Sequence, residues 1–255
     1  HLKMNLRQFL ILMSTITMVA ANMLFQQVSD FLFDTTPNSY GKYYDSLTLI
    51  SPEEFTFLIW APIFIGMLVF AIYQALPKNR NSSLLDDLLL PTIIINIANG
   101  LSLYIPFGYN VLVLIVLLFG LGWAFVKIQN FKSEKPVSFW LIEFPYTIFF
   151  SWISVALIVT TSQSLSFFDW NSFGLSENIW ISILVVVAMS IGLFITRMYR
   201  TYVYPLVLVW AFIGILATNY ALSNWGVVFL ITFCTIILLT YLSRLYIRRR
   251  SNNLP

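Results

Sequence analysis

The chain has 255 residues, of which 59% are hydrophobic and 10% are charged, and its mean hydropathy is +0.82. A soluble domain carries about 25% charged residues, so this composition excludes both a water-soluble globule and a disordered chain. The sequence predicts an integral membrane protein whose first partner is the lipid bilayer, with no nucleic-acid partner. A single cysteine and a single histidine exclude an internal disulfide and a histidine metal cluster, so no metal site is expected.

Runs of apolar residues long enough, or nearly so, to cross a ~30 Å hydrocarbon layer follow one another along the chain. They lack the strict alternation of a barrel strand, so we expect helices, which satisfy their own backbone hydrogen bonds in lipid. The prediction is an all-α polytopic membrane bundle of about eight transmembrane helices. The expected spans are Phe9–Val28, Phe55–Leu76, Leu88–Phe107, Tyr109–Val126, Phe139–Thr161, Ile179–Thr196, Tyr202–Leu222 and Trp225–Leu242.

The basic residues test this count and give the orientation. With eight spans, thirteen of the 14 Lys and Arg residues fall on the side that holds both termini, and only Lys42 falls on the other side. The positive-inside rule makes the basic side cytoplasmic, so the N- and C-termini are predicted to be cytoplasmic. The basic residues of that side are Lys3, Arg7, Lys78, Arg80, Lys127, Lys132, Lys135, Arg197, Arg200, Arg244, Arg248, Arg249 and Arg250.

Two segments outside the spans carry further predictions. The first outer loop, residues 29–54, is the longest loop and is rich in acidic and tyrosine side chains. Long loops in compact proteins often cover a site, so a lid and a disordered connection remain equal interpretations. The basic tail, residues 244–250, is interpreted as a stop-transfer signal and an anchor to lipid headgroups.

No catalytic constellation stands out, and Glu143 is the only acid well inside a predicted span. An intramembrane acid is a functional candidate because its burial is costly. Glu143 nevertheless lies about one turn from the cytoplasmic start of its span, two residues before Pro145. Pairing with a nearby Lys or Arg, or reaching the interface, is therefore favoured over a proton relay, which would need further acids deeper in the bundle.

Uncharged polar residues within the spans have two interpretations. They commonly form hydrogen bonds between helices, which we take as the default, and they can also orient a ligand in an apolar cavity. The same choice holds for Trp60, Trp152 and Trp210, which lie deep in their spans and can pack against helices or line a cavity for a flat ligand. The polar candidates are Asn22, Asn96, Asn99, Ser151, Ser154 and Asn219.

The second predicted span with its entry reads SPEEFTFLIWAPIFIGMLVFAIYQ, residues 51–74. A proline precedes an aromatic-x-Phe-x-x-Trp run, and another aromatic residue follows one turn later. This segment resembles the second helix of the TspO/MBR family of tryptophan-rich sensory and translocator proteins. The residues that carry the resemblance are Pro52, Phe55, Phe57, Trp60 and Phe64.

Two further segments resemble the same family. The fifth span, EFPYTIFFSWISVALIVTTS (143–162), has a Pro-Tyr pair followed by Trp152 and Ala156, and the third span offers Asn99. The resemblance covers residues 1–165, which we predict to be a five-helix core. Residues 166–255 are then a three-helix extension with a basic tail, as in long bacterial relatives, which implies a bacterial inner (cytoplasmic) membrane.

The resemblance implies an apolar pocket for a lipophilic molecule. Family members bind porphyrins and sterol-like ligands, so a tetrapyrrole or a carotenoid is the ligand class expected here, with no cofactor otherwise implied. By correspondence with the family, the ligand-binding residues are Trp60, Phe64, Asn99, Trp152 and Ala156. Leu239, Tyr241 and Arg244 match the weak cholesterol pattern, but on the wrong helix, so no sterol site is predicted there.

The leading hypothesis is therefore a ligand-binding or sensory membrane protein, with an enzyme as the least favoured class. A small-molecule transporter is the second hypothesis, although transporters generally show polar pathways, internal repeats and broken helices. Proline residues inside the predicted spans, at 62, 91, 106, 145 and 205, would supply such breaks. The third hypothesis is a structural or pigment-contacting subunit that packs against partner helices, as a homodimer or in a larger membrane complex.

Overall fold

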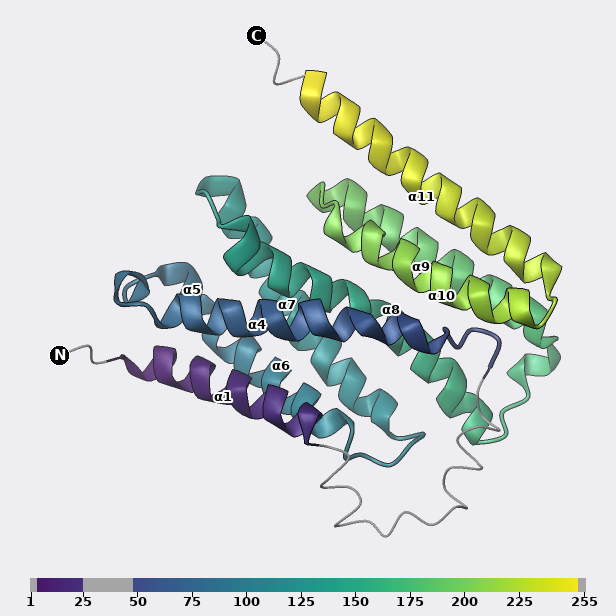
Figure 1. Cartoon of the computed structure of the whole chain (residues 1–255), viewed down its shortest axis with the longest axis horizontal. Coiled ribbons are helices and arrows are strands. Elements are labelled where there is room, and N and C mark those ends of the chain that lie inside the picture. Colours follow the sequence, from purple (N-terminus) through teal and green to yellow (C-terminus); the bar gives the residue numbers. More distant parts are fainter. Residues whose placement is uncertain (1–3, 25–47, 252–255) are drawn as a thin grey trace.

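The structure is a computed structural model that describes residues 4–24 and 48–251, with side chains up to residue 247. Every regular element within these ranges is a helix, and the helices are gathered in one bundle (Figure 1). In chain order they are α1 (Leu6–Met23), η1 (Glu54–Ile59), α4 (Trp60–Ala75), η2 (Pro77–Asn79), α5 (Ser83–Asp87), α6 (Leu89–Ser102), α7 (Asn110–Glu134), η3 (Phe139–Glu143), α8 (Phe144–Phe167), η4 (Ser172–Gly174), α9 (Glu177–Tyr199), α10 (Val203–Ala221) and α11 (Trp225–Ser251).

Seven helical segments of the described chain are long and apolar enough to cross a membrane. They correspond to seven of the expected spans, which confirms an all-α polytopic bundle. The expected third span, Leu88–Phe107, is the exception, because α6 has only 14 residues and ends at Ser102. Residues 103–109 form a turn that contains Pro106 and Gly108, whose φ is +90°.

A short helix, α5, precedes α6 with one intervening residue. Pro91 explains the break, because its ring lacks an N–H and clashes with the carbonyl of Asp87 four residues earlier. Together α5 and α6 span about 20 residues, or roughly 30 Å at 1.5 Å per residue. Lys127 of α7 lies 3.5 Å from Asp87, which places the start of α6 beside the last turns of α7, as an antiparallel pair requires.

The prolines begin helices instead of breaking them in the middle. Pro62, Pro91, Pro145 and Pro205 each lie within the first three residues of their helices, where a missing N–H costs little. Before Pro145 the chain makes a π-helical turn, η3, in which the Glu143 N–H donates to the carbonyl oxygen of Ser138 (3.2 Å). Two of these prolines still lie inside longer candidate spans, Glu54–Ala75 and Phe139–Phe167, whose first turns are 3-10 and π-helical.

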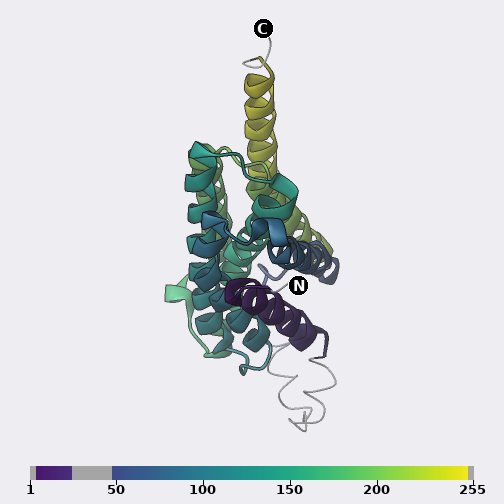
Figure 2. The ribbon, with the colours of Figure 1, turned by 90° about the vertical axis from the view of Figure 1, so that its left-hand side faces the viewer.

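Helix α8 is the central element of the bundle. It packs against α4, α7 and α10, and 67% of its most apolar 18-residue window is buried, against 33% for α1, α7, α9 and α11. Helix α6 packs between α1 and α7, and α11 packs against α9 and α10. In the turned view the C-terminal part of α11 rises beyond the other helices (Figure 2).

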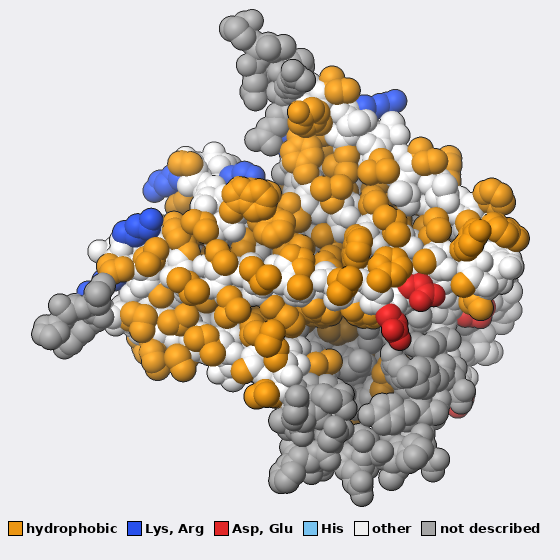
Figure 3. Space-filling model, in the orientation of Figure 1, with side chains coloured by type: hydrophobic (Ala, Val, Ile, Leu, Met, Phe, Trp, Pro, Cys, Tyr) orange, Lys and Arg blue, Asp and Glu red, His pale blue; other side chains and the backbone are white. Residues whose placement is uncertain are grey.

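The charges lie at the two ends of the bundle, as the sequence predicts. Lys and Arg side chains appear along the left and upper edges of the molecule and acidic side chains on its right-hand side, with a broad apolar surface between them (Figure 3). Many apolar side chains of the molecule are exposed, among them Phe119 (65%) and Phe229 (71%). An exposed apolar surface of this kind contacts hydrocarbon, so the protein is an integral membrane protein.

Candidate functional site

The segment before α4 is held by α10. The indole Nε1 of Trp210 donates to the carbonyl oxygen of Thr56 (2.8 Å), and the Thr218 hydroxyl donates to the carbonyl oxygen of Ser51 (2.9 Å). The Glu53 N–H donates to the carbonyl oxygen of Gly214 (3.2 Å), where the absence of a Cβ lets the two backbones approach. The predicted extension, residues 166–255, therefore holds part of the predicted core; the division into these two parts stays a prediction.

Helix α4 begins at Trp60 and meets α8 through a group of rings that we call the aromatic cluster. Trp60 stacks on Phe64 of the next turn, with ring centroids 5.2 Å apart and planes at 22°. On the α8 side, Trp60 makes edge contacts with Phe149 (5.8 Å) and Trp152 (6.4 Å). Phe57 of η1 adds a further edge contact to Trp152 (5.9 Å). The aromatic cluster is thus Phe57, Trp60, Phe64, Phe149 and Trp152.

The aromatic cluster combines exposed faces with a buried donor. Phe57 is 49% exposed, and Trp60 and Phe64 are half-buried, whereas the side chain of Trp152 is only 2% exposed. The indole N–H of Trp152 has no hydrogen-bond acceptor among the described residues. An unpaired buried donor is costly, and it can be satisfied by a ligand that carries an acceptor. The arrangement offers stacking surface together with one N–H donor.

Of the other predicted ligand residues, Ala156 lies near the cluster and Asn99 is engaged elsewhere. Ala156 follows Trp152 by one turn on α8 and is half-buried. Asn99 is 1% exposed in the seam between α1 and α6, where its Oδ1 accepts a hydrogen bond from Nδ2 of Asn22 (3.0 Å). In the same seam Nδ2 of Asn96 donates to the hydroxyl of Ser14 (2.8 Å). The asparagines of this seam therefore bond helix to helix.

Glu143 lies in η3, at the end of the bundle where the Lys and Arg side chains gather. Its side chain is 5% exposed, and its Oε1 lies 2.6 Å from Nζ of Lys132, whose side chain is 41% exposed. Nε2 of Gln129 donates a longer hydrogen bond to the same oxygen (3.4 Å). The buried carboxylate is therefore paired with a cation that reaches water, which is how a protein lowers the cost of such burial.

Two predicted segments lie wholly or partly outside the described residues, and two contacts of the site were not predicted from the sequence. Most of the predicted lid, residues 29–54, lies in the undescribed range 25–47. The side chains of the basic tail beyond residue 247 also lie outside the described residues. Phe149 was not predicted, although it shares a face of α8 with Trp152 at a spacing of three residues. The partner of Trp210 could not be found from spacing, because Thr56 is 154 positions away.

The comparison with protein families gives one match. A family model described as TSPO-like protein matches residues 8–245, so the similarity continues through α9, α10 and most of α11. No curated protein and no solved structure matches the chain.

Proposed function

We propose that this chain, which belongs to the TSPO-like family, binds a flat lipophilic molecule of the porphyrin or carotenoid class against the aromatic cluster. Membership of the family indicates a membrane protein with a ligand-binding or sensory role in general. The finer proposal is that Trp60 and Phe64 stack on the ligand while Trp152 donates to a polar atom of it. Its proposed setting is the inner membrane of a bacterium, in keeping with the resemblance to long bacterial relatives.

The unpaired N–H of Trp152 is the observation that carries the proposal. The indole of Trp210, by contrast, is paired with the carbonyl oxygen of Thr56 (2.8 Å). Other buried polar atoms of the described core also lack partners, among them the hydroxyls of Ser164 and Tyr204, but the N–H of Trp152 is the one that belongs to a ring of the aromatic cluster. If the side chain at position 152 only packed against its neighbours, phenylalanine would do so without the cost of a buried, unpaired N–H. Porphyrins carry carboxylate oxygens and oxidised carotenoids carry carbonyl oxygens, so both offer an acceptor together with a flat apolar body.

The experiment is a titration of the purified protein with protoporphyrin in mild detergent, followed by the absorption of the porphyrin itself. Porphyrin absorption reports binding without relying on tryptophan fluorescence, so variants that lack a tryptophan can be compared directly with the unaltered protein. Trp152→Phe keeps most of the ring and removes the N–H, so we expect the Kd to rise about tenfold, the value of one buried hydrogen bond. Trp140→Phe is the matched control, because Trp140 is 68% exposed and lies outside the cluster. Binding that does not saturate, or equal losses in both variants, would overturn the proposal.

Ala156 and Asn99 receive separate tests within this titration. We propose that Ala156 borders the ligand, so that Ala156→Leu narrows the space and weakens binding, whereas Ala221→Leu at the end of α10 does not. For Asn99 the hydrogen bond to Asn22 supports a structural role. Asn99→Ala and Asn22→Ala should then lower thermal stability alike and leave the Kd unchanged. If Asn99→Ala raises the Kd and Asn22→Ala does not, Asn99 contacts the ligand.

A further inference from the structure

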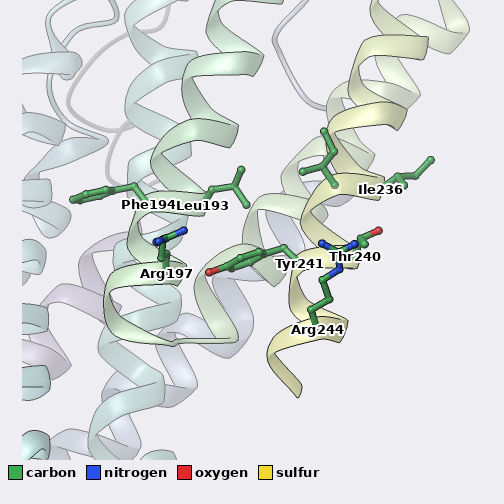
Figure 4. A pocket seen from close by; sticks show the side chains of 8 residues that line it. Leu193, Phe194, Arg197, Ile236, Thr240, Tyr241 and Arg244 are labelled. Atoms are coloured by element: carbon green, nitrogen blue, oxygen red, sulfur yellow. The ribbon is translucent and has the colours of Figure 1, made fainter. Parts of the chain in front are cut away.

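A groove separates the C-terminal halves of α9 and α11, on the part of the bundle that the aromatic cluster does not reach. Its volume is about 460 Å³. Figure 1 shows α11 diverging from α9 toward its C-terminal end, and Figure 4 shows side chains of the two helices on either side of the groove. The lining residues are Leu193, Phe194, Arg197, Ile236, Ile237, Thr240, Tyr241 and Arg244.

The two arginines of the groove lie at the same depth in the membrane. Arg197 is about 30 Å along α9 from Glu177, and Arg244 is about 28 Å along α11 from Trp225, at 1.5 Å per residue. Both helices begin at the outer face, so both guanidinium groups reach the inner edge of a ~30 Å hydrocarbon layer. This edge is the level of the phosphate groups of the inner leaflet.

The charges of the groove are not compensated within the described protein. Its ion pairs use Arg7, Lys127 and Lys132, whereas Arg197 and Arg244 take part in none. Both arginines are exposed, and Tyr241 extends from α11 toward α9, with Arg197 and Arg244 on either side of it in this view (Figure 4). Two arginines at one level form a site for a phosphate group, because guanidinium donates paired hydrogen bonds to phosphate oxygens.

The remaining walls fit an acyl chain. Leu193, Ile236 and Ile237 line the groove one turn or more toward the membrane centre from the arginines. We propose that the groove binds one anionic glycerophospholipid of the inner leaflet, with its phosphate between Arg197 and Arg244 and an acyl chain along these apolar residues. The proposal does not depend on the aromatic cluster or on the ligand proposed for it.

The test uses the full chain in nanodiscs of equal parts phosphatidylglycerol and phosphatidylcholine, released for native mass spectrometry. We expect one phosphatidylglycerol to remain bound in preference to phosphatidylcholine. In the double variant Arg197→Gln/Arg244→Gln its retention should fall about thirtyfold, as expected for the loss of two direct hydrogen-bonding contacts between guanidinium and phosphate. The double variant Arg80→Gln/Arg200→Gln is the control, because it removes the same charge from the same face and neither residue lines the groove.

A second variant distinguishes a lipid bound in the groove from anionic lipid that is attracted to basic residues in general. Ile236→Trp fills the apolar part and keeps both arginines; Ile236 is 55% exposed, so the change is tolerated by the fold. It should lower phosphatidylglycerol retention as well, with helix content and elution volume unchanged. Retention that persists in this variant, equal losses in the Arg80/Arg200 control, equal retention of phosphatidylcholine, or displacement by soluble glycerol phosphate would each overturn the proposal.

Discussion

Trp210 of α10 donates its indole N–H to the carbonyl oxygen of Thr56, 154 positions earlier in the chain, over 2.8 Å. The same indole ring meets Phe55 edge-on, with ring centroids 5.7 Å apart. Thr56 lies in the short 3-10 helix that contains Phe57 and leads into Trp60, so α10 holds the segment that carries the first two rings of the aromatic cluster. A residue of the C-terminal helices therefore holds a segment next to a candidate ligand residue of the N-terminal helices.

Replacing Trp210 by phenylalanine should loosen the segment before α4. The ring is retained in part, but the carbonyl oxygen of Thr56 loses its indole donor, at a cost of about 1 kcal/mol. We expect faster amide hydrogen exchange in residues 48–60 and a lower temperature of thermal unfolding. Trp140→Phe, at an exposed position, should change neither; unchanged exchange in Trp210→Phe would show that the indole N–H is dispensable.

Gly214→Ala should push the same segment away from α10. A Cβ at this position would collide with the hydroxyl oxygen of Thr56 and lie 3.0 Å from Cβ of Pro52. Overpacking of this kind costs about 1–3 kcal/mol, and here it should also weaken binding at the aromatic cluster. Gly226→Ala is the matched control, because nothing lies within 4 Å of the added atom. The measurements are thermal unfolding and the porphyrin titration, and equal behaviour of the two variants would contradict the prediction.

Arg7 should be the most sensitive basic residue at the end of the bundle where the Lys and Arg side chains gather. Its guanidinium is buried and donates to the carbonyl oxygens of Asn79 (2.7 Å) and Ser82 (3.2 Å), and to Oδ1 of Asp86 (2.6 Å). Arg7→Gln leaves these acceptors short of donors, with an expected loss of about 2–3 kcal/mol. Limited proteolysis between α4 and α5 and thermal unfolding measure the effect. Arg80→Gln should be neutral, since Arg80 is exposed.

Lys132 and Glu143 should behave as a coupled pair. Lys132→Met leaves a buried carboxylate without its cation, and we expect a loss of about 1–2 kcal/mol, reduced from the value for fully buried pairs because Lys132 is 41% exposed. The double variant Lys132→Met/Glu143→Gln should recover part of this loss. Thermal unfolding of the unaltered protein, the two single variants Lys132→Met and Glu143→Gln, and the double variant gives the coupling energy between the two side chains. Additive losses would mean that the 2.6 Å contact contributes nothing.

The apolar runs could be predicted because apolar length is a local quantity: seven of the eight expected spans have helices long and apolar enough to cross, and their direction stays a prediction. Apolar length determines whether a run crosses the membrane, and the positions of Lys and Arg determine its direction. The ends of α6 were harder to predict. Pro91 divides the expected third span and the turn at Pro106 and Gly108 shortens it, and hydropathy does not respond to either effect.

The sequence predicted that polar side chains would form hydrogen bonds between helices, but it did not predict which residues would pair. Asn22 and Asn99 were expected to bond between helices, but their mutual pairing depends on the relative rotation of α1 and α6. Trp60 and Trp152 were singled out by their depth in the predicted spans and by a family resemblance, whereas the unpaired N–H of Trp152 is seen only when all its neighbours are in place. Which donor lacks an acceptor is a property of the whole packing, and no sequence pattern records it.

The hydrogen bonds from α10 to the segment before α4 also set an order of events during synthesis. A ribosome that has just inserted α4 has about 135 residues still to make before Trp210 emerges, and membrane domains assemble as their helices become available. Until α10 arrives, the carbonyl oxygens of Ser51 and Thr56 lack the donors that hold them in the finished protein. The segment that leads into Trp60 therefore acquires these hydrogen bonds only after α10 has been made, although the rings of the cluster itself all come from η1, α4 and α8.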